Sequence, residues 1–346
     1  MSRFLQLHLL TFYPPANLNR DDTGRPKTAV IGGTTRLRVS SQSLKRAWRT
    51  SDVFHTALKG HLASRTQRLG ELVLDHLRAR GLAEAQALEG ARAIAGVFGK
   101  LKDAADGHPA RIEQLAFISP QERDAALALA DRLLAGEAVA PQAEDLLRRS
   151  DTAVDLAMFG RMLAADPDYN REAAVQVAHA FTTHAVPIED DFYTAVDDLK
   201  KPSEDAGAGF VGEAGFGSGV FYLYICIDRA LLLRNLGGSD NAALAATAIA
   251  ALVEACATVS PGGKQASFAS RAHAHYVLAE RGDTQPRTLG GAFARPVGDD
   301  PVHASVRELR AWRDALDQAY GAPAARAEME VGKAGTLADV ITFCRD

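Results

Sequence analysis

The stretch 36–49, RLRVSSQSLKRAWR, gathers cationic side chains in a chain that is mildly acidic overall. Five of its 14 residues are Arg or Lys and none is acidic, whereas the formal net charge of the chain is −4. Guanidinium and ammonium groups beside short hydroxyl and amide donors suit the phosphate and ribose oxygens of a nucleic acid. The residue types and their spacing therefore predict a seat for a phosphodiester backbone.

The basic character begins upstream, in a long loop that the Pro and Gly content predicts over residues 13–35. Only Asp21 and Asp22 oppose the basic residues between positions 20 and 49. These basic residues are Arg20, Arg25, Lys27, Arg36, Arg38, Lys45, Arg46 and Arg49. Long loops in compact domains usually have a functional role, so we treat the whole segment as one candidate binding region.

The local pattern predicts a strand, a cap and a helix in succession. Basic and apolar residues alternate over Arg36–Val39, which is typical of a strand with one buried and one charged face. Ser40 or Ser41 then caps a helix that begins near Gln42. Ser43 belongs to the same polar turn and adds a further hydroxyl donor.

On this helix Lys45 and Arg49 are four residues apart and share one face. Lys45 falls in the predicted first turn, where the dipole already favours an anion, so a cation there is a poor choice for helix stability alone. The alternative interpretation is a solvated basic helix whose charges pair with acids elsewhere in the fold. The residue pattern gives these two interpretations about equal weight.

A second feature is the pair of adjacent aromatic residues in the segment DDFY, Asp190–Tyr193. Aromatic rings on a Gly-rich loop can stack on nucleic-acid bases, each stack contributing about 1–3 kcal/mol. The alternative is that a ring anchors the loop to the core. We interpret Phe192 and Tyr193 as dividing these two tasks between them.

Catalytic and metal-binding patterns are weak. His273 and His275 are two residues apart, but no Cys or acid nearby completes a ligand set. Four aspartates between positions 190 and 198 have the oxygen ligands of a divalent cation, although acids on an exposed loop are usually only solvated. The sequence contains no P-loop, no G-x-S-x-G and no Cys-x-x-Cys motif. We therefore predict no cofactor and no resident metal.

Alternating and helical periodicities supply the elements that must position these groups. We expect strands over Phe4–Phe12, Arg36–Val39, residues 174–184 and residues 218–228. Helices are expected throughout residues 56–150, over 239–259 with Ser239 or Asp240 as cap, and near 301–320. Residues 185–217 are expected to be a second long irregular stretch. The order strand–helix–strand–strand–helix–strand, with a large insertion, predicts an α+β fold with the ferredoxin-like arrangement of RNA recognition motifs.

Composition narrows the class of protein. The 346 residues are 47% hydrophobic and 24% charged, which is sufficient for a sizeable core. No run of about 18 apolar residues occurs, so no membrane span is predicted, and the N-terminus lacks the features of a signal peptide. Three widely spaced cysteines favour a reducing cytoplasm over a disulfide framework or a zinc site.

Several short motifs, taken together, resemble the CasC family, the backbone subunits of the type I-E CRISPR surveillance complex Cascade. LNRDD at 18–22 is followed by Lys27, by Gly32–Gly33 and by RLRVSSQSLKRAWR. Further matches follow in family order across most of the chain. They are VDLAMFGRM (154–162), AHAFTTH (178–184), TAVDDL (194–199), GSGVFY (217–222), NLGG (235–238) and PGGKQ (261–265).

The resemblance implies a hand-shaped subunit that stacks with other copies of itself into a helical filament along one guide RNA. Its RNA-recognition-motif-like palm would comprise residues 1–57, 173–187 and 218–346. A helical fingers insertion would comprise residues 58–172, and a protruding thumb residues 188–217. In the family each thumb crosses the guide and displaces a base at a regular interval. Target DNA, paired through the guide, and the other Cascade subunits would be the further partners.

The resemblance also implies which residues contact the guide. Its backbone contacts on the palm are Arg20, Lys27, Ser40, Gln42, Lys45 and Arg49, with Arg46 as a neighbour that joins them. Met162 would lie near the guide bases, and Phe192 and Tyr193 would meet the displaced base. The family usually has a Trp-Phe pair where this chain has Phe-Tyr. Lys264 is a further expected backbone contact.

Two alternatives to a non-catalytic RNA-binding scaffold remain open. Related backbone subunits of type III complexes cleave target RNA through a thumb aspartate, and Asp190 and Asp191 lie in a comparable region. The chain would then be a metal-dependent ribonuclease. The other alternative is a helical protein–protein adaptor with an incidental basic patch.

Overall fold

The computed structural model describes residues 2–103, 107–163, 165–195 and 210–346. The chain divides into two compact units. The first, the sheet unit, comprises Met1–Val53, Val177–Cys226 and Leu252–Asp346. The second, the helical unit, comprises Phe54–Gln176 and Ile227–Ala251, so it interrupts the sheet unit twice along the chain.

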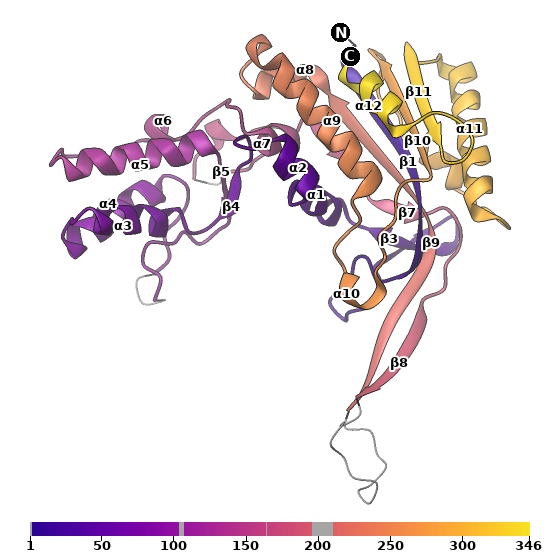
Figure 1. Ribbon diagram of the computed structural model, residues 1–346, viewed down its shortest axis with the longest axis horizontal. Coiled ribbons are helices and arrows are strands. Elements are labelled where there is room, and N and C mark those ends of the chain that lie inside the picture. Colours follow the sequence, from indigo (N-terminus) through magenta and orange to yellow (C-terminus); the bar gives the residue numbers. More distant parts are fainter. Residues whose placement is uncertain (1, 104–106, 164, 196–209) are drawn as a thin grey trace, which may run out of the picture. The chain divides into compact units, whose positions relative to one another are not determined.

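Nine strands of the described residues form one large sheet (Figure 1). Its order is β11-β10-β1-β9-β7-β3-β2, and β6 and β8 pair with β9 outside this order. The strands are β1 (Phe4–Ala16), β2 (Thr28–Ile31), β3 (Thr34–Val39), β6 (Val175–Val177), β7 (Ala180–Thr182), β8 (Glu189–Ala195), β9 (Phe210–Asp228), β10 (Tyr276–Gly282) and β11 (Ala325–Glu330). Antiparallel pairing joins β1 to β10, β10 to β11 and β3 to β7. The predicted α+β class is therefore confirmed.

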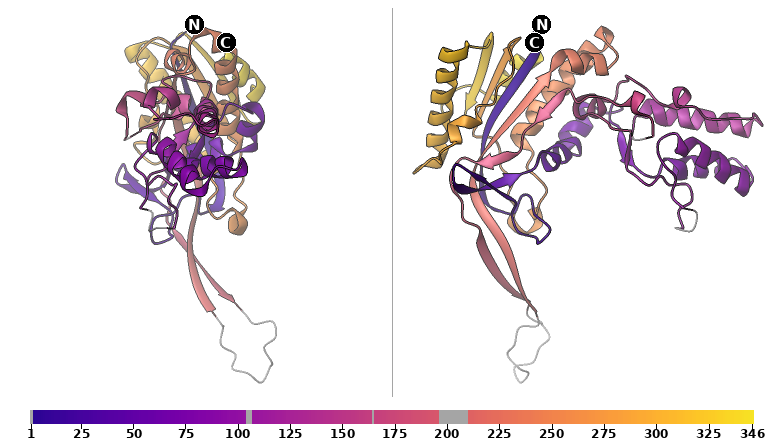
Figure 2. Two further views of the ribbon diagram at one scale, coloured as in Figure 1. Left: turned by 90° about the vertical axis from the view of Figure 1, so that its left-hand side faces the viewer. Right: turned by 180° about the vertical axis from the view of Figure 1, so that it is seen from behind.

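Helices cover both faces of the β10 region of this sheet, as Figure 2 also shows. Tyr276 and Leu278 of β10 belong to a buried cluster with Leu309 of α11 (Pro301–Tyr320). The Arg281 guanidinium, by contrast, lies over the Phe343 ring of α12 (Leu337–Arg345). Because successive strand residues point to opposite faces, α11 and α12 lie on opposite sides of β10.

A cluster of polar side chains is buried on the α11 side of the sheet. His8 of β1 and Glu280 of β10 are both fully buried, and His8 Nε2 is 3.4 Å from Glu280 Oε2. Arg326 of β11 donates from Nε to Glu280 Oε1 at 2.8 Å. The Tyr222 hydroxyl is 2.9 Å from His8 Nδ1. Buried charges are tolerated when paired in this way, so these contacts fix β1, β10 and β11 relative to one another.

Helix α9 (Ala242–Thr258) confirms the helix predicted over 239–259, although Ser239–Asn241 form a 3₁₀ turn before it. Of the described helices, the stretch Ser239–Thr258 is long and apolar enough to cross a membrane by length and composition alone. A core helix passes the same test, and half of this stretch is buried within the fold. Core packing therefore accounts for its apolar composition.

The predicted loop over residues 13–35 is wrong at both ends. Strand β1 continues to Ala16, and β2 and β3 form a hairpin in which Thr28 pairs with Leu37 and Ile31 with Thr34. Gly32 and Gly33 make its two-residue turn with φ of +59° and +76°, which glycine adopts without strain. Only residues 17–27 remain as an irregular turn.

The prediction for residues 185–217 is also wrong where the structure describes them. Strand β8 pairs with β9 along its whole length, from Glu189 opposite Phe216 to Ala195 opposite Phe210. Figure 1 shows this two-stranded ribbon extending from the sheet as a continuation of β9. All seven residues of β8 are exposed, so neither face carries the apolar alternation that marks a half-buried strand. Residues 174–184 form two short strands, β6 and β7, instead of one.

Arg36 does not lie on a charged face as predicted. Its side chain is fully buried, and the guanidinium donates to the carbonyl oxygens of Thr182 at 2.8 Å and Phe293 at 3.3 Å. Because buried donors must find acceptors, these carbonyls make Arg36 a structural residue. Cys226, Cys256 and Cys344 are buried and unbridged, as expected.

The helical unit confirms the helical character predicted for residues 56–150. Its cluster of buried side chains includes Val73 and Leu77 of one helix and Ala91 and Ile94 of the next. The α-helices among the described residues of 52–235 are α2 (Asp52–Ala57), α3 (Leu69–Ala79), α4 (Glu84–Gly96), α5 (Pro120–Leu134), α6 (Ala143–Leu146), α7 (Val154–Phe159) and α8 (Arg229–Asn235). Strands β4 (Ser64–Thr66) and β5 (Ala116–Ile118) pair beside them.

Candidate nucleic-acid interface

The predicted basic helix is α1, Ser41–Arg49. Ser40 is its N-cap, as expected, because its hydroxyl accepts from the Ser43 N–H at 3.4 Å. The Ser40 N–H in turn donates to Asn19 Oδ1 at 2.9 Å, which ties the helix start to the turn at 17–27. Ser40 is itself buried, so the structure gives it a structural role.

Three sides of α1 have different surroundings. At about 100° per residue, Leu44 and Trp48 share one side, and both are buried in the core. A second side lines a cavity through Ser43, Arg46, Ala47 and Thr50. The third side carries Gln42, Lys45 and Arg49. Lys45 and Arg49 thus share a face as predicted, but that face is not the one that lines the cavity.

The expected conflict between Lys45 and the helix dipole does not occur. Because α1 begins at Ser41, Lys45 is its fifth residue and lies beyond the first turn. Arg46 and Arg49 lie in the last turn, where the dipole favours cations. Desolvation lowers the pKa of the half-buried Lys45 ammonium. Helix stability alone is therefore enough to explain the positions of the two arginines along α1.

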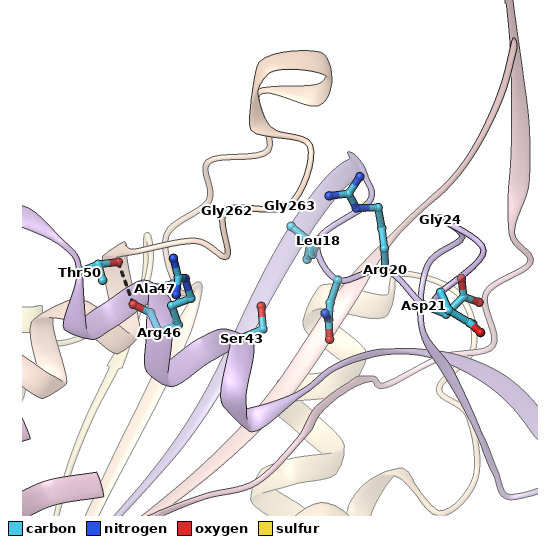
Figure 3. Close-up of a pocket in the computed structure, with 12 residues that line it drawn as sticks. Leu18, Arg20, Asp21, Gly24, Ser43, Arg46, Ala47, Thr50, Gly262 and Gly263 are labelled. Atoms are coloured by element: carbon cyan, nitrogen blue, oxygen red, sulfur yellow. Dashed lines mark hydrogen bonds between the residues drawn. The ribbon is translucent and has the colours of Figure 1, made fainter. Parts of the chain in front are cut away.

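The cavity beside α1 has a volume of about 670 Å³ and is formed by three segments of the sheet unit. These are residues 18–24 of the turn at 17–27, helix α1 with Thr50, and the loop that carries Gly262 and Gly263. Figure 3 shows Arg46 and Ser43 rising from the helix towards the glycines, with Arg20 on the far side of the same opening. The arrangement brings two exposed guanidinium groups to one cavity.

The acids of the turn also line the cavity, but Asp21 is engaged within the turn. Its Oδ1 accepts from the Thr23 hydroxyl at 2.7 Å, the Thr23 N–H at 2.9 Å and the Arg25 N–H at 3.0 Å. These hydrogen bonds, that of the Thr23 side chain first, lower the pKa of Asp21. In Figure 3 the Asp21 carboxylate points away from Arg20 and Arg46.

The glycine pair closes the cavity by a close backbone approach. A Cβ on Gly263 would lie 2.3 Å from the Leu18 oxygen and 2.6 Å from the Asn17 oxygen. Only glycine fits there without a shift of the backbone. Lys264 follows with φ of +50° and is half-buried as the cap of α10 (Gln265–Phe268). The expected contact Lys264 therefore adjoins the cavity without lining it.

Lys27 lies at the end of the turn at 17–27 and is half-buried. Its N–H donates to the Asn19 oxygen at 2.8 Å, which closes the turn. Of the expected palm contacts, Arg20 and Arg46 line the cavity. Ser43, expected as a further hydroxyl donor, also lines it. Thr50 lines the cavity too but was not expected; a helical projection of residues 41–50 gives the signal that would have found it.

The two aromatic residues have different surroundings on β8. Tyr193 lies over its cross-strand partner Gly212, whereas Phe192 is 71% exposed. The expected anchor to the core is not seen, because the Tyr193 ring packs on the ribbon and is 46% exposed. A stacking role for either ring stays a prediction. Asp190, on the same strand, pairs with Arg25 at 2.9 Å.

Met162 belongs to the helical unit and is 84% exposed. It lines a separate cavity of about 400 Å³ with Leu115 and Lys100. Within the described part of the chain, no group of three or more His, Cys, Asp or Glu side chains is arranged to hold a metal ion. Asp197 and Asp198 lie outside the described residues.

Comparisons with known proteins agree with the resemblance that the short sequence motifs indicated. The family model described as "CT1975-like protein" matches residues 5–340. A chain of a solved "CRISPR RNA-guided surveillance complex, pre-nicking" is 31% identical with a TM-score of 0.83, covering 96% of this chain and 94% of that one. A chain of a second "CRISPR RNA-guided surveillance complex" is 29% identical with a TM-score of 0.73, covering 97% and 94%. No curated protein matches.

The family match spans nearly the whole chain and includes both compact units. Because the match is this extensive, it confirms the resemblance to the CasC family that the scattered motifs first indicated. The chain belongs to the family of CT1975-like proteins.

Proposed function

We propose that this chain is a non-catalytic backbone subunit of a CRISPR surveillance complex that binds the guide RNA. Copies of the chain would oligomerise along the guide and present it for pairing with target DNA in the cytoplasm. The similarity to chains of two RNA-guided surveillance complexes over most of its length supports this role. The type I-E subtype and the RNA-recognition-motif-like palm rest on the sequence resemblance.

The observation that carries the proposal is the cavity beside α1. The Thr50 hydroxyl lines this cavity but already donates to the Arg46 oxygen at 2.8 Å. Arg20 and Arg46 supply cations, and Ser43 supplies a hydroxyl donor. Such groups bind phosphate and ribose oxygens and carry no base preference. A guide complex must accept guide RNAs of any sequence, because base pairing with the guide recognises the target. A site that binds the RNA sugar–phosphate backbone meets this requirement.

The third side of α1 extends the proposed interface beyond the cavity. Gln42, Lys45 and Arg49 lie next to the cavity side on the same short helix. An RNA strand that follows the helix surface would contact both sides in turn. Retention of guide RNA should therefore depend on the pair Arg20 and Arg46 and, separately, on the pair Lys45 and Arg49.

RNA affinity measured across a salt series tests this proposal. The double variants R20A/R46A and K45A/R49A should each bind RNA of several unrelated sequences more weakly, and by similar factors. Each should also reduce the slope of log affinity against log salt by about 1.4, because two cations on a single strand are removed. R123A/R132A, at two exposed positions of α5, is the control, since both arginines pair with neighbouring acids. Unchanged affinity and slope in both palm variants would contradict the proposal.

The ribonuclease alternative is supported by no observation on the described residues. Asp190 is engaged by Arg25, and the described acids form no group suited to a metal ion. Incubation of the assembled complex with complementary RNA and Mg²⁺ distinguishes the two functions. The scaffold leaves that RNA intact, whereas cleavage at regular intervals would identify the nuclease.

A further inference from the structure

The β8–β9 ribbon needs an external support to hold a fixed direction. Its outer part contains only two strands, and β8 is exposed along its whole length. A two-stranded ribbon without a packed face is marginally stable by itself. Whatever fixes the direction of Phe192 and Tyr193 must therefore act at the base of the ribbon.

Three contacts meet at that base. The Asn17 side-chain amide donates to the Gly215 oxygen of β9 at 2.9 Å, and Asn17 is buried. The Arg25 guanidinium lies 2.9 Å from Asp190 Oδ1 of β8 and 3.6 Å from Glu213 Oε1 of β9, so it bridges both strands. A Cβ on Gly215 would lie 3.1 Å from the Pro26 ring, which means that the turn packs directly on the ribbon.

The same turn carries the cavity residues. The second hydrogen of the Asn17 amide is donated to the Gly24 oxygen at 3.0 Å, so one side chain joins the turn to the ribbon. Asp21 binds the N–H groups of Thr23 and Arg25, and Arg20 pairs with Pro26 across the turn. The segment 17–26 is therefore internally bonded, with the cavity on one side and the ribbon on the other.

We propose that Asn17 and Arg25 are positioning residues. They hold Phe192 and Tyr193 of the ribbon at a fixed position relative to the cavity beside α1. Neither residue lines the cavity. They act by fixing the ribbon to the turn that carries Arg20. The inference rests on the proposed function for its biological meaning. It explains how one subunit keeps a ring that stacks on a base at a set distance from the cavity that binds the RNA sugar–phosphate backbone.

The test measures the direction of the ribbon in the full-length chain without RNA. Spin labels at T194C on β8 and R307C on α11 report one distance within the sheet unit, and the three native cysteines are buried. We expect a single narrow distance distribution for the parent. N17D retains the side-chain shape but replaces the amide donor with an acceptor facing two carbonyls, so the distribution should broaden about twofold, as for an unsupported ribbon.

R25Q is the second variant, in case N17D lowers the melting temperature. It should broaden the distribution without changing that temperature, because an exposed ion pair contributes little to folding stability. R25K retains the charge and should restore a narrow distribution. R132Q removes a comparably exposed pair, Arg132–Glu137, and should leave the distance unchanged.

The two proposals fail in distinguishable ways. Distributions of N17D and R25Q that coincide with the parent would overturn the positioning role, whatever the RNA affinity. Broadened distributions support it even if the R20A/R46A chain binds RNA as the parent does, a result that would count against the cavity alone.

Discussion

Tyr193 of β8 lies directly over Gly212 of β9, its cross-strand partner. A Cβ on Gly212 would meet Tyr193 Cζ at 2.4 Å and the hydroxyl oxygen at 2.6 Å, so the ring occupies the space that a side chain would fill. Phe192 points to the opposite face of the strand and is 71% exposed. Phe192 is therefore the more exposed of the two rings, because Tyr193 is 46% exposed.

The two rings should therefore respond differently to truncation. F192A should weaken binding of RNA by about 1–3 kcal/mol, the usual contribution of one stacked base, with no loss of folding stability. Y193A should alter the ribbon itself. Fluorescence of 2-aminopurine placed along the RNA checks this, because loss of stacking in F192A raises the emission at one position in the repeat. A larger rise in Y193A than in F192A would reverse the assignment.

The glycine pair at 262–263 gives a matched test of the cavity. G263A places a Cβ against the Leu18 oxygen, and overpacking of this kind costs about 1–3 kcal/mol. G262A meets nothing within 4 Å and should be close to neutral. Thermal unfolding and RNA affinity of the two variants check the prediction. Equal behaviour of both would mean that the loop does not need its close approach to residues 17–18.

Breaking the buried ion pair Arg161–Glu122 should strongly destabilise the helical unit. Arg161 Nη1 is 2.7 Å from Glu122 Oε2, and the side chains are 1% and 0% exposed. Glu122 also completes the capping box of α5 with Ser119. R161M leaves a buried carboxylate without its partner, so we expect a loss of about 3–5 kcal/mol in urea unfolding.

R132M is the control for that measurement. Its pair with Glu137 is half exposed, and such pairs contribute about 0–1 kcal/mol. If R161M and R132M unfold at the same urea concentration, burial does not decide the cost of breaking these pairs.

Stability should fall in acid through Glu280. Burial opposes its ionisation, but the contacts of His8 and Arg326 outweigh that effect and lower the pKa from 4.5 to about 2. A carboxyl with a lowered pKa stabilises the fold fully above its unfolded value, and this contribution is lost as the pH falls from about 4.5 to about 2. Unfolding free energies measured across that range should decline in the parent.

E280Q removes the titrating group, so it should be less stable at neutral pH and show a flatter decline below pH 4.5. The neutral loss follows from removing the buried negative charge that Arg326 and Arg287 both contact, although Arg326 keeps its ion pair with Asp317. An E280Q profile parallel to that of the parent throughout this range would assign the acid sensitivity to other carboxyl groups.

Local chemistry determined the elements whose signals are contained within a few residues. Ser40 caps α1 because a hydroxyl ahead of a helical pattern satisfies an N–H of the first turn, and this can be recognised from the residue type alone. The long helices α9 and α11 follow from apolar periodicity in the same way. The family, too, was visible in motifs spread along the chain.

The β8–β9 ribbon could not be predicted from residues 185–217, because an exposed two-stranded ribbon has no buried face to impose alternation. The same limit applies to α1. Its sequence shows how many cations it carries. Which of them line the cavity depends on which side of the helix packs on the core, and Leu44 and Trp48 form that side.

The sequence by itself determined the fold class, the capped basic helix and the family. Only the tertiary structure decided that Arg36 is buried between the carbonyls of Thr182 and Phe293, and that Arg20, Arg46 and Gly263 meet at one cavity. The physical reason is that both results depend on contacts between segments more than 100 residues apart. Residue type shows that a guanidinium needs acceptors, but the acceptors it finds are set by how the chain folds back on itself.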